Sequence, residues 1–153
     1  MPHYNFDLDH QVILTKLQEA GISFKNKVIY VTGAAGFLGS WTCEAFCKQG
    51  AFVYGFDDLS SGLIENLTYL EKMPNFHFIK HDAGMPFMPG GRSSSGSNIP
   101  DVDHIDYILH MASRASPFEF EKYPLHIIQT NTCCCTLANM RWRAGWESYC
   151  KCC

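Results

Sequence analysis

The chain has 153 residues, of which 46% are hydrophobic and 18% are charged, with a net charge of −3. This composition fits one globular core and excludes a disordered tail, and the scattered basic residues exclude nucleic acid and anionic membranes as partners. The N-terminus lacks the basic and apolar blocks of a secretory signal, and no apolar run reaches the roughly 18 residues that span a membrane. A cytoplasmic protein is therefore expected.

Strand and helix patterns alternate along the chain. Leu8, Val12 and Leu17 lie at helical spacing, which predicts an amphipathic helix in an N-terminal extension of residues 1–26. Helices are expected at 8–20, 37–50, 61–73 and from 123 onward. Apolar runs predict strands at 27–33, 51–58, 75–82 and 104–113.

This alternation predicts an α/β fold, a Rossmann-type doubly wound parallel sheet. Right-handed crossovers give a partial sheet of order 3-2-1-4, with a crevice between the first and fourth strands, where the order reverses. The sheet belongs to a domain over residues 27–132. Residues 84–102, rich in Gly, Pro and Ser, are expected to form a flexible insertion in it.

Three glycines stand where the first strand meets the next helix, in the run "VTGAAGFLGSW". Gly33 would allow the tight turn off the strand, and Gly39 would let the helix pack closely against it. Gly36 lacks a Cβ, so a diphosphate could approach the first helical amides, where the helix dipole favours an anion. The alternative is a tight packing turn that binds no ligand.

An acid, Asp57, ends the second strand and strengthens the dinucleotide interpretation. Its carboxylate could accept hydrogen bonds from ribose hydroxyls and would repel a 2′-phosphate, which favours NAD over NADP. No Arg precedes Arg92. Asp57 could instead initiate a helix. Ser60, Ser61 and Gly62 would surround the ribose or form a solvated turn.

The motifs "VTGAAGFLGS", "GFDDLSSG", "KHDAG" and "YILHMASRASP" together resemble the extended short-chain dehydrogenase/reductase family, the NAD-dependent epimerases and dehydratases. The run "HMASRASP" before "YPLHIIQTNT" looks most like UDP-glucuronate decarboxylases. The resemblance implies NAD as cofactor, a UDP-sugar as substrate of intact relatives, and a homodimer in full-length relatives.

The resemblance also assigns site residues. The diphosphate would lie against Gly36, Phe37 and Leu38, the ribose against Asp57 and Asp58, and the adenine against Asp82 and Ala83. Met111, Ala112 and Ser113 would line the path to the nicotinamide, with Thr130 nearby. Alternatives stay open: Asp82 could simply end a strand, Ser113 could form a turn, and Arg114 could be a surface charge rather than a group near substrate phosphates. His110 is expected to be a core histidine.

Family catalysis needs a Tyr four residues before a Lys, because the Lys lowers the pKa of the Tyr that acts as general base. None of the seven Tyr residues has Lys at this spacing. The chain is therefore expected to be an N-terminal part, with the C-terminal half of the fold missing, that is inactive alone. The alternative is a stand-alone NAD-binding regulatory module or pseudoenzyme.

The segment 133–153 holds six of the eight cysteines and breaks with the composition before it. It is expected to be an aberrant tail that arises from a damaged reading frame or splice boundary. Zinc is the alternative, but adjacent cysteines lack the usual C-x2-C spacing, so no metal site is expected. Cys43 and Cys47 are expected to be buried small apolar residues. The fourth strand would be an apolar edge that favours association with other chains.

Overall fold

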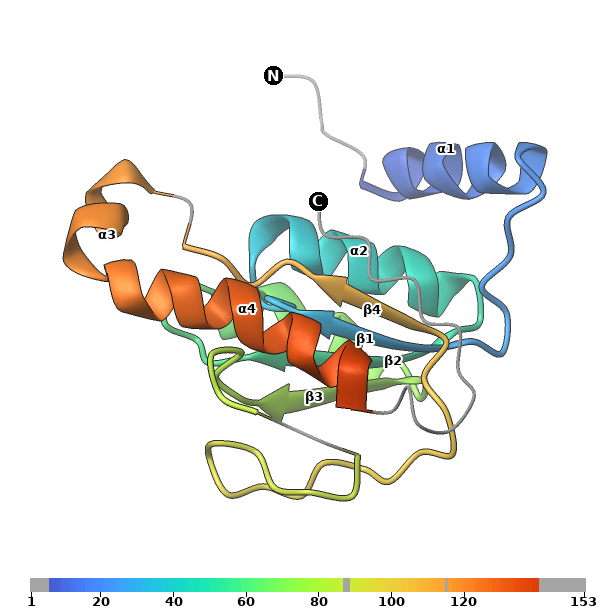
Figure 1. Ribbon diagram of the computed structural model, residues 1–153. Helices are drawn as coiled ribbons and strands as arrows, with labels where there is room; N and C mark the ends of the chain where they lie inside the picture. Colours follow the sequence, from blue (N-terminus) through green and yellow to red (C-terminus); the bar gives the residue numbers. More distant parts are fainter. Residues whose placement is uncertain (1–5, 87–88, 115, 141–153) are drawn as a thin grey trace.

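Four parallel strands form the centre of the computed structural model, which describes residues 6–86, 89–114 and 116–140 (Figure 1). The strands are β1 (Val28–Thr32), β2 (Phe52–Asp57), β3 (Phe76–Lys80) and β4 (Tyr107–His110). They pair in the order β3-β2-β1-β4. The predicted α/β fold and sheet order are confirmed, and the order reverses between β1 and β4, as expected.

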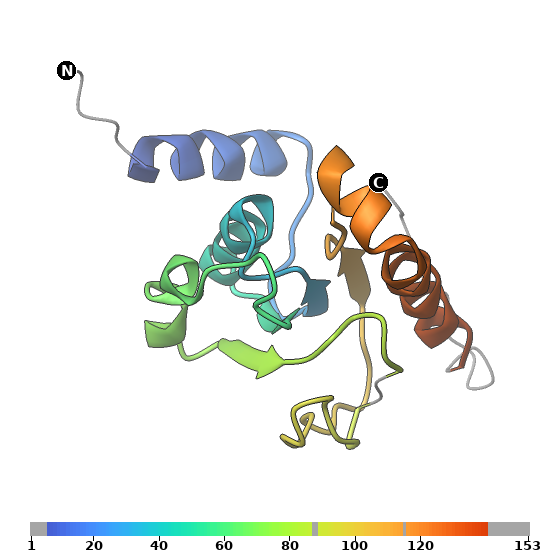
Figure 2. The ribbon, with the colours of Figure 1, turned by 90° about the vertical axis from the view of Figure 1, so that its left-hand side faces the viewer.

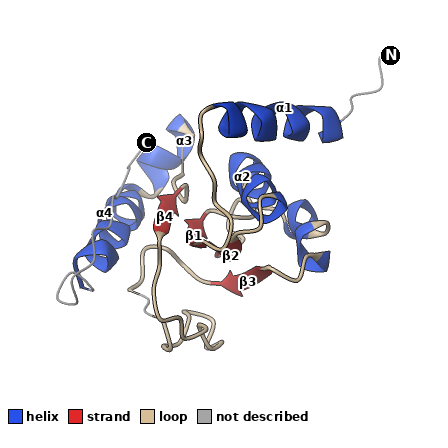
Figure 3. Ribbon diagram, turned by 90° about the vertical axis from the view of Figure 1, so that its right-hand side faces the viewer, coloured by secondary structure: helices blue, strands red, loops and turns tan. Residues whose placement is uncertain are grey.

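Helices lie on both sides of this sheet. They are α1 (Phe6–Glu19), α2 (Phe37–Lys48), α3 (Pro117–Lys122) and α4 (Pro124–Met140). Figures 2 and 3 show α2 against one face of the sheet and α4 on the other side, next to β4. The helices predicted at 8–20, 37–50 and from 123 are confirmed. Within the described residues, no helix is long and apolar enough to cross a membrane.

The helix predicted over 61–73 is wrong. Two short 3₁₀ helices, Ile64–Leu67 and Leu70–Lys72, stand in its place. The apolar residues recur every third position, and Leu67 and Leu70 are both fully buried. A repeat of three matches the 3.0 residues per turn of a 3₁₀ helix better than the 3.6 of an α-helix, so this geometry keeps the apolar side chains on one face.

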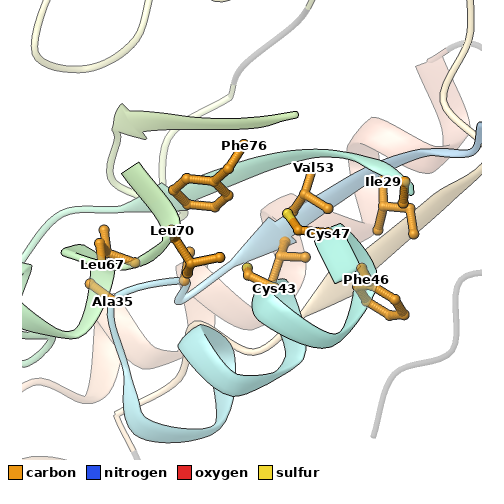
Figure 4. Close-up of a cluster of buried hydrophobic side chains, with 12 residues drawn as sticks. Ile29, Ala35, Cys43, Phe46, Cys47, Val53, Leu67, Leu70 and Phe76 are labelled. Atoms are coloured by element: carbon orange, nitrogen blue, oxygen red, sulfur yellow. The ribbon is translucent and has the colours of Figure 1, made fainter. Parts of the chain in front are cut away.

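The main core lies between α2 and the sheet (Figure 4). Ile29 and Val53 from the strands meet Cys43 and Phe46 from α2, and all four are buried. Cys43 and Cys47 are free thiols, and the prediction that they act as small buried apolar residues is confirmed. Burial raises the pKa of both thiols, that of Cys47 to about 12, so neither is a reactive thiolate at neutral pH.

The leading helix α1 packs differently from the pattern in its sequence. Leu8 and Val12 are exposed, whereas His10 is buried and stacks on Trp41 of α2 with ring centroids 4.7 Å apart. His10 Nε2 also lies 3.5 Å from the Glu44 carboxylate. An aromatic and polar contact, rather than the apolar stripe, therefore joins this helix to α2.

A second, smaller cluster lies on the other face of the sheet, where Tyr30, Phe56 and Ile79 pack with Ile99. Ile99 comes from the predicted insertion, whose described residues contain no helix and only an isolated bridge between Arg92 and Asn98. The flexibility of the insertion stays a prediction. In the predicted tail, α4 continues to Met140; residues 141–153, and with them the alternative zinc site, lie outside the described residues.

Candidate functional site

A cleft of about 120 Å³ opens at the carboxyl ends of the strands, around the point where the sheet order reverses. Open parallel sheets place ligands at this position because the loops that follow neighbouring strands diverge there. The lining residues are Gly33, Gly36, Asp57, Asp58, Ser60, Ser61, Gly62, His81, Asp82, Ala83, Met111, Ala112, Ser113, Arg114, His126 and Thr130. The volume is below the roughly 300–1,000 Å³ of small-molecule pockets, so a dinucleotide would extend along the open surface.

Thirteen of the sixteen predicted site residues line this cleft, and Phe37, Leu38 and Gly39 do not. Phe37 and Leu38 open α2 and are 74% and 65% exposed, and their predicted contact with a diphosphate would be made by their backbone amides. His81 and His126 line the cleft without having been predicted, and Arg114, for which a surface charge and a place near substrate phosphates were both left open, lines it as well. His126 stands one helical turn before Thr130, and this spacing could have identified it.

The glycine turn is built by close backbone contacts. Gly33 has φ +74°, and a Cβ on it would lie 2.6 Å from the carbonyl oxygen of Met111. A Cβ on Gly39 would lie 1.9 Å from the carbonyl oxygen of Gly33. Side chains at these two positions would therefore separate the turn both from the segment after β4 and from its own helix.

The N-terminus of α2 is free of competing negative charge. Gly36 is its N-cap and supplies no side-chain hydrogen bond, and the first turn contains no Asp or Glu. The first amides of a helix lack intrahelical partners and carry the positive end of its dipole. An anion such as a phosphate therefore fits this end of α2.

Asp57 has a structural role that the sequence analysis missed. One carboxylate oxygen accepts the N–H of Ala35 at 2.9 Å, and the other accepts the N–H of Leu59 at 2.8 Å. The carboxylate therefore joins the glycine turn to the loop after β2 while it lines the cleft. Burial raises the pKa of Asp57, although the two N–H donors oppose that shift. Each oxygen keeps a second lone pair that could accept a ribose hydroxyl.

Asp58, Asp82 and His126 meet at one side of the cleft, with one possible ligand atom of each within 4.8 Å of the others. His126 Nε2 lies 3.3 Å from Asp82 Oδ1, and His126 Nδ1 lies 3.4 Å from Thr130 Oγ1. Carboxylate and imidazole groups could together hold a divalent cation. The contact between His126 and Asp82 already explains why these side chains converge. His126 thus bridges Thr130 and Asp82, and Asp82 is the residue that the family resemblance places at the adenine.

The segment after β4 is fixed to β1 by a single side chain. Thr32 Oγ1 lies 2.8 Å from His110 Nδ1 and accepts the N–H of Met111 at 3.2 Å. His110 is half-buried, and burial lowers its pKa while an interaction with Asn131 partly opposes this shift. At neutral pH the ring is therefore uncharged, and the role of His110 as a core histidine stays a prediction.

Comparisons with known proteins agree with this geometry. The family model described as "NAD dependent epimerase/dehydratase family" matches residues 29–136. UDP-glucuronic acid decarboxylase 1 of Arabidopsis thaliana is 33% identical over 111 residues, which cover 72% of this chain and 22% of the plant protein. UDP-glucose 4-epimerase of Mycolicibacterium smegmatis is 50% identical over 52 residues, 34% of this chain and 17% of that protein. The chain thus spans about a fifth of these relatives.

Solved structures show the same fold. The UDP-Glc/GlcNAc 4-epimerase of Campylobacter jejuni matches with a TM-score of 0.56 at 23% identity. The match covers 78% of this chain and 34% of the epimerase chain. The UDP-glucose 4-epimerase of Thermus thermophilus, solved in complex with NAD, matches with a TM-score of 0.53 at 22% identity. This match covers 78% of this chain and 35% of the epimerase chain. Because the family model covers most of the chain, the protein belongs to the NAD-dependent epimerase/dehydratase family.

Proposed function

We propose that the cleft binds NAD, with the diphosphate at the first amides of α2 and the adenosine ribose at Asp57. The uncapped and uncharged N-terminus of α2 carries this proposal, because it leaves helix amides available to an anion beside a fixed carboxylate. The close approach of Gly33 and Gly39 keeps side chains out of the turn. The NAD complexes of related folds support the choice of cofactor.

Asp57 makes the site selective for NAD over NADP. Its carboxylate is held in place by Ala35 and Leu59, so it cannot easily turn away from a 2′-phosphate. The cleft offers no Lys or Arg next to Asp57 on the β2 loop, where Asp58, Ser60, Ser61 and Gly62 follow. Like charges a few ångströms apart in a partly buried site repel strongly, so the phosphate of NADP would be rejected.

We further propose that the chain contributes cofactor binding to chemistry on a UDP-sugar. The names of the relatives support this substrate class, since they include UDP-glucuronic acid decarboxylases and UDP-glucose 4-epimerases. Bound NAD would supply a hydride acceptor for the sugar. The chain itself has no Tyr followed four residues later by Lys, so we propose that it binds the cofactor without turning over a sugar alone. A regulatory NAD-binding module is the second candidate, and the same sequence observation favours it.

Calorimetric titration of the full chain tests the binding proposal. We expect NAD⁺ to bind at least about tenfold more tightly than NADP⁺. Asp57→Asn should reduce this preference, because it removes the charge that repels the 2′-phosphate while it keeps an oxygen acceptor. Asp101→Asn, in an exposed residue outside the cleft, is the matched control and should preserve the preference. Folded protein that binds neither cofactor would contradict the proposal. Formation of NADH with UDP-glucuronate would show that the chain carries its own catalytic base.

A further inference from the structure

Arg114 lies just after β4, and the segment that follows it holds its guanidinium group. Nη1 donates to Glu119 Oε1 at 2.5 Å, and the guanidinium carbon lies 4.7 Å from the centre of the Tyr123 ring. The side chain is only 17% exposed. A carboxylate and an aromatic ring thus fix the planar group in one orientation, which is how an arginine is prepared to bind an anion.

One donor of this arginine has no hydrogen-bond partner in the described part of the chain. Nε is buried and makes no hydrogen bond with the described residues. Glu119 receives a bond from Nη1 alone, so most of the five guanidinium N–H groups stay available. A buried donor without an acceptor is unfavourable and needs an explanation such as a water or a ligand. Nε itself is covered by protein atoms, but Arg114 lines the cleft, so a ligand there could accept hydrogen bonds from the terminal guanidinium N–H groups that Glu119 does not use.

The charges along the cleft show what kind of ligand needs this arginine. Asp57, Asp58 and Asp82 line it, and Arg114 is the one Lys or Arg among the described lining residues. His81 and His126 also line it, and His126 is already paired with Asp82. A diphosphate that enters beside three carboxylates is repelled unless a fixed positive charge compensates for them.

The segment that carries Arg114 begins against the glycine turn, because the carbonyl oxygen of Met111 lies 2.6 Å from the Cβ position of Gly33. Gly36 and Arg114 line the same cleft. We propose that Arg114 binds the diphosphate of the dinucleotide across the cleft from the first amides of α2. This inference rests on the proposed function and adds the cationic half of the diphosphate site. The diphosphate of a UDP-sugar has the same chemistry, so the test must distinguish the two.

Calorimetric titrations of the full chain with NAD⁺, adenosine and UDP-glucose make that distinction. Arg114→Gln should weaken NAD⁺ binding at least about tenfold and leave adenosine binding within twofold, because adenosine has no phosphate. Arg114→Lys keeps the charge but loses the planar guanidinium group. Its NAD⁺ affinity should lie between that of the wild-type chain and that of Arg114→Gln. Arg92→Gln removes the same charge from the insertion, outside the cleft lining, and should change NAD⁺ affinity less than twofold.

The outcomes separate this inference from the proposed function. Folded wild-type protein without affinity for NAD⁺ would overturn both. Equal NAD⁺ binding by the wild-type chain and Arg114→Gln would overturn the role of Arg114 alone, and so would a loss confined to UDP-glucose. If both Arg114 variants fail to fold, displacement of bound NAD⁺ by inorganic pyrophosphate can be measured in the wild-type chain instead. Pyrophosphate should displace NAD⁺ and leave adenosine bound, and failure to displace NAD⁺ would refute the inference.

Discussion

The two walls of the cleft are built in different ways. The wall of β1, α2 and β2 belongs to the main core, and most residues of its strands are buried. The wall of β4, α3 and α4 has no fully buried residue in β4 or α3. It is held by half-buried apolar side chains such as Leu109 and by polar contacts such as Thr32 with His110. A ligand that bridges the cleft would therefore stabilise the second wall more than the first.

The exposed side chains give the same contrast. On the second wall, the apolar side chains of Phe118, Leu125 and Ile128 are exposed, and β4 forms one edge of the described sheet. Exposed apolar surface beside an open strand edge favours association. We therefore predict that chains associate through the second wall. Analytical ultracentrifugation over a range of concentrations would test it.

The largest expected effect comes from breaking the first wall. Gly39→Ala would place a methyl group 1.9 Å from the carbonyl oxygen of Gly33, and neither backbone segment can move without disturbing the core. We expect a loss of at least about 3 kcal/mol in the free energy of unfolding, or failure to fold. Gly21→Ala is the control, because its φ is +68° but nothing lies within 4 Å. It should cost about 1 kcal/mol from backbone strain. Similar urea midpoints for both variants would refute the packing argument.

A smaller effect is expected where a carboxylate joins the two walls at the other end of the strands. Asp106 accepts the N–H of Val28 at 2.8 Å and pairs with Lys27 at 2.9 Å. Burial alone would raise the pKa of Asp106, but the Val28 N–H and the Lys27 ammonium outweigh burial and hold the pKa below its ordinary value. The stabilisation is therefore present above the unfolded pKa of about 3.9 and is lost as the pH falls through the lower folded pKa.

Asp106→Asn should accordingly destabilise the chain by about 1–2 kcal/mol at pH 7, with a difference that shrinks as the pH falls below the unfolded pKa of about 3.9. Asp103→Asn, in an exposed residue nearby, is the control and should have little effect at either pH. Urea unfolding at several pH values measures the difference. If the difference in the free energy of unfolding between Asp106→Asn and wild type does not change with pH, the charge of Asp106 does not contribute to stability.

The smallest expected effect belongs to His110 on the second wall. Burial lowers its pKa, so its neutral form is favoured in the folded chain. The corresponding stability is present above the unfolded pKa of about 6.5 and is lost as the pH falls through the folded pKa. His110→Gln should therefore flatten the stability profile just below the unfolded pKa of about 6.5. An unchanged slope there would show that protonation of His110 is not coupled to folding.

The sequence predicted the first wall better than the second, and the reason is physical. Buried parallel strands leave long apolar runs, and a glycine turn leaves a fixed spacing, so both are visible in one chain. The helix α3 was not predicted, although Ser116 at the N-cap and Pro117 at the first position are known start signals. The bonds of Asp57 to Ala35 and of Arg114 to Glu119 were not predicted, because they depend on how loops meet in space.

The most direct test of the central claim observes the amides at the start of α2. In an assigned ¹⁵N-labelled chain, NAD⁺ should shift the backbone resonances of Phe37, Leu38 and Gly39 strongly, whereas adenosine should shift the Asp57 and Asp58 region without them. This result would place the diphosphate on the uncapped helix end. Saturating NAD⁺ that leaves these three amides unchanged in the folded protein would contradict the account.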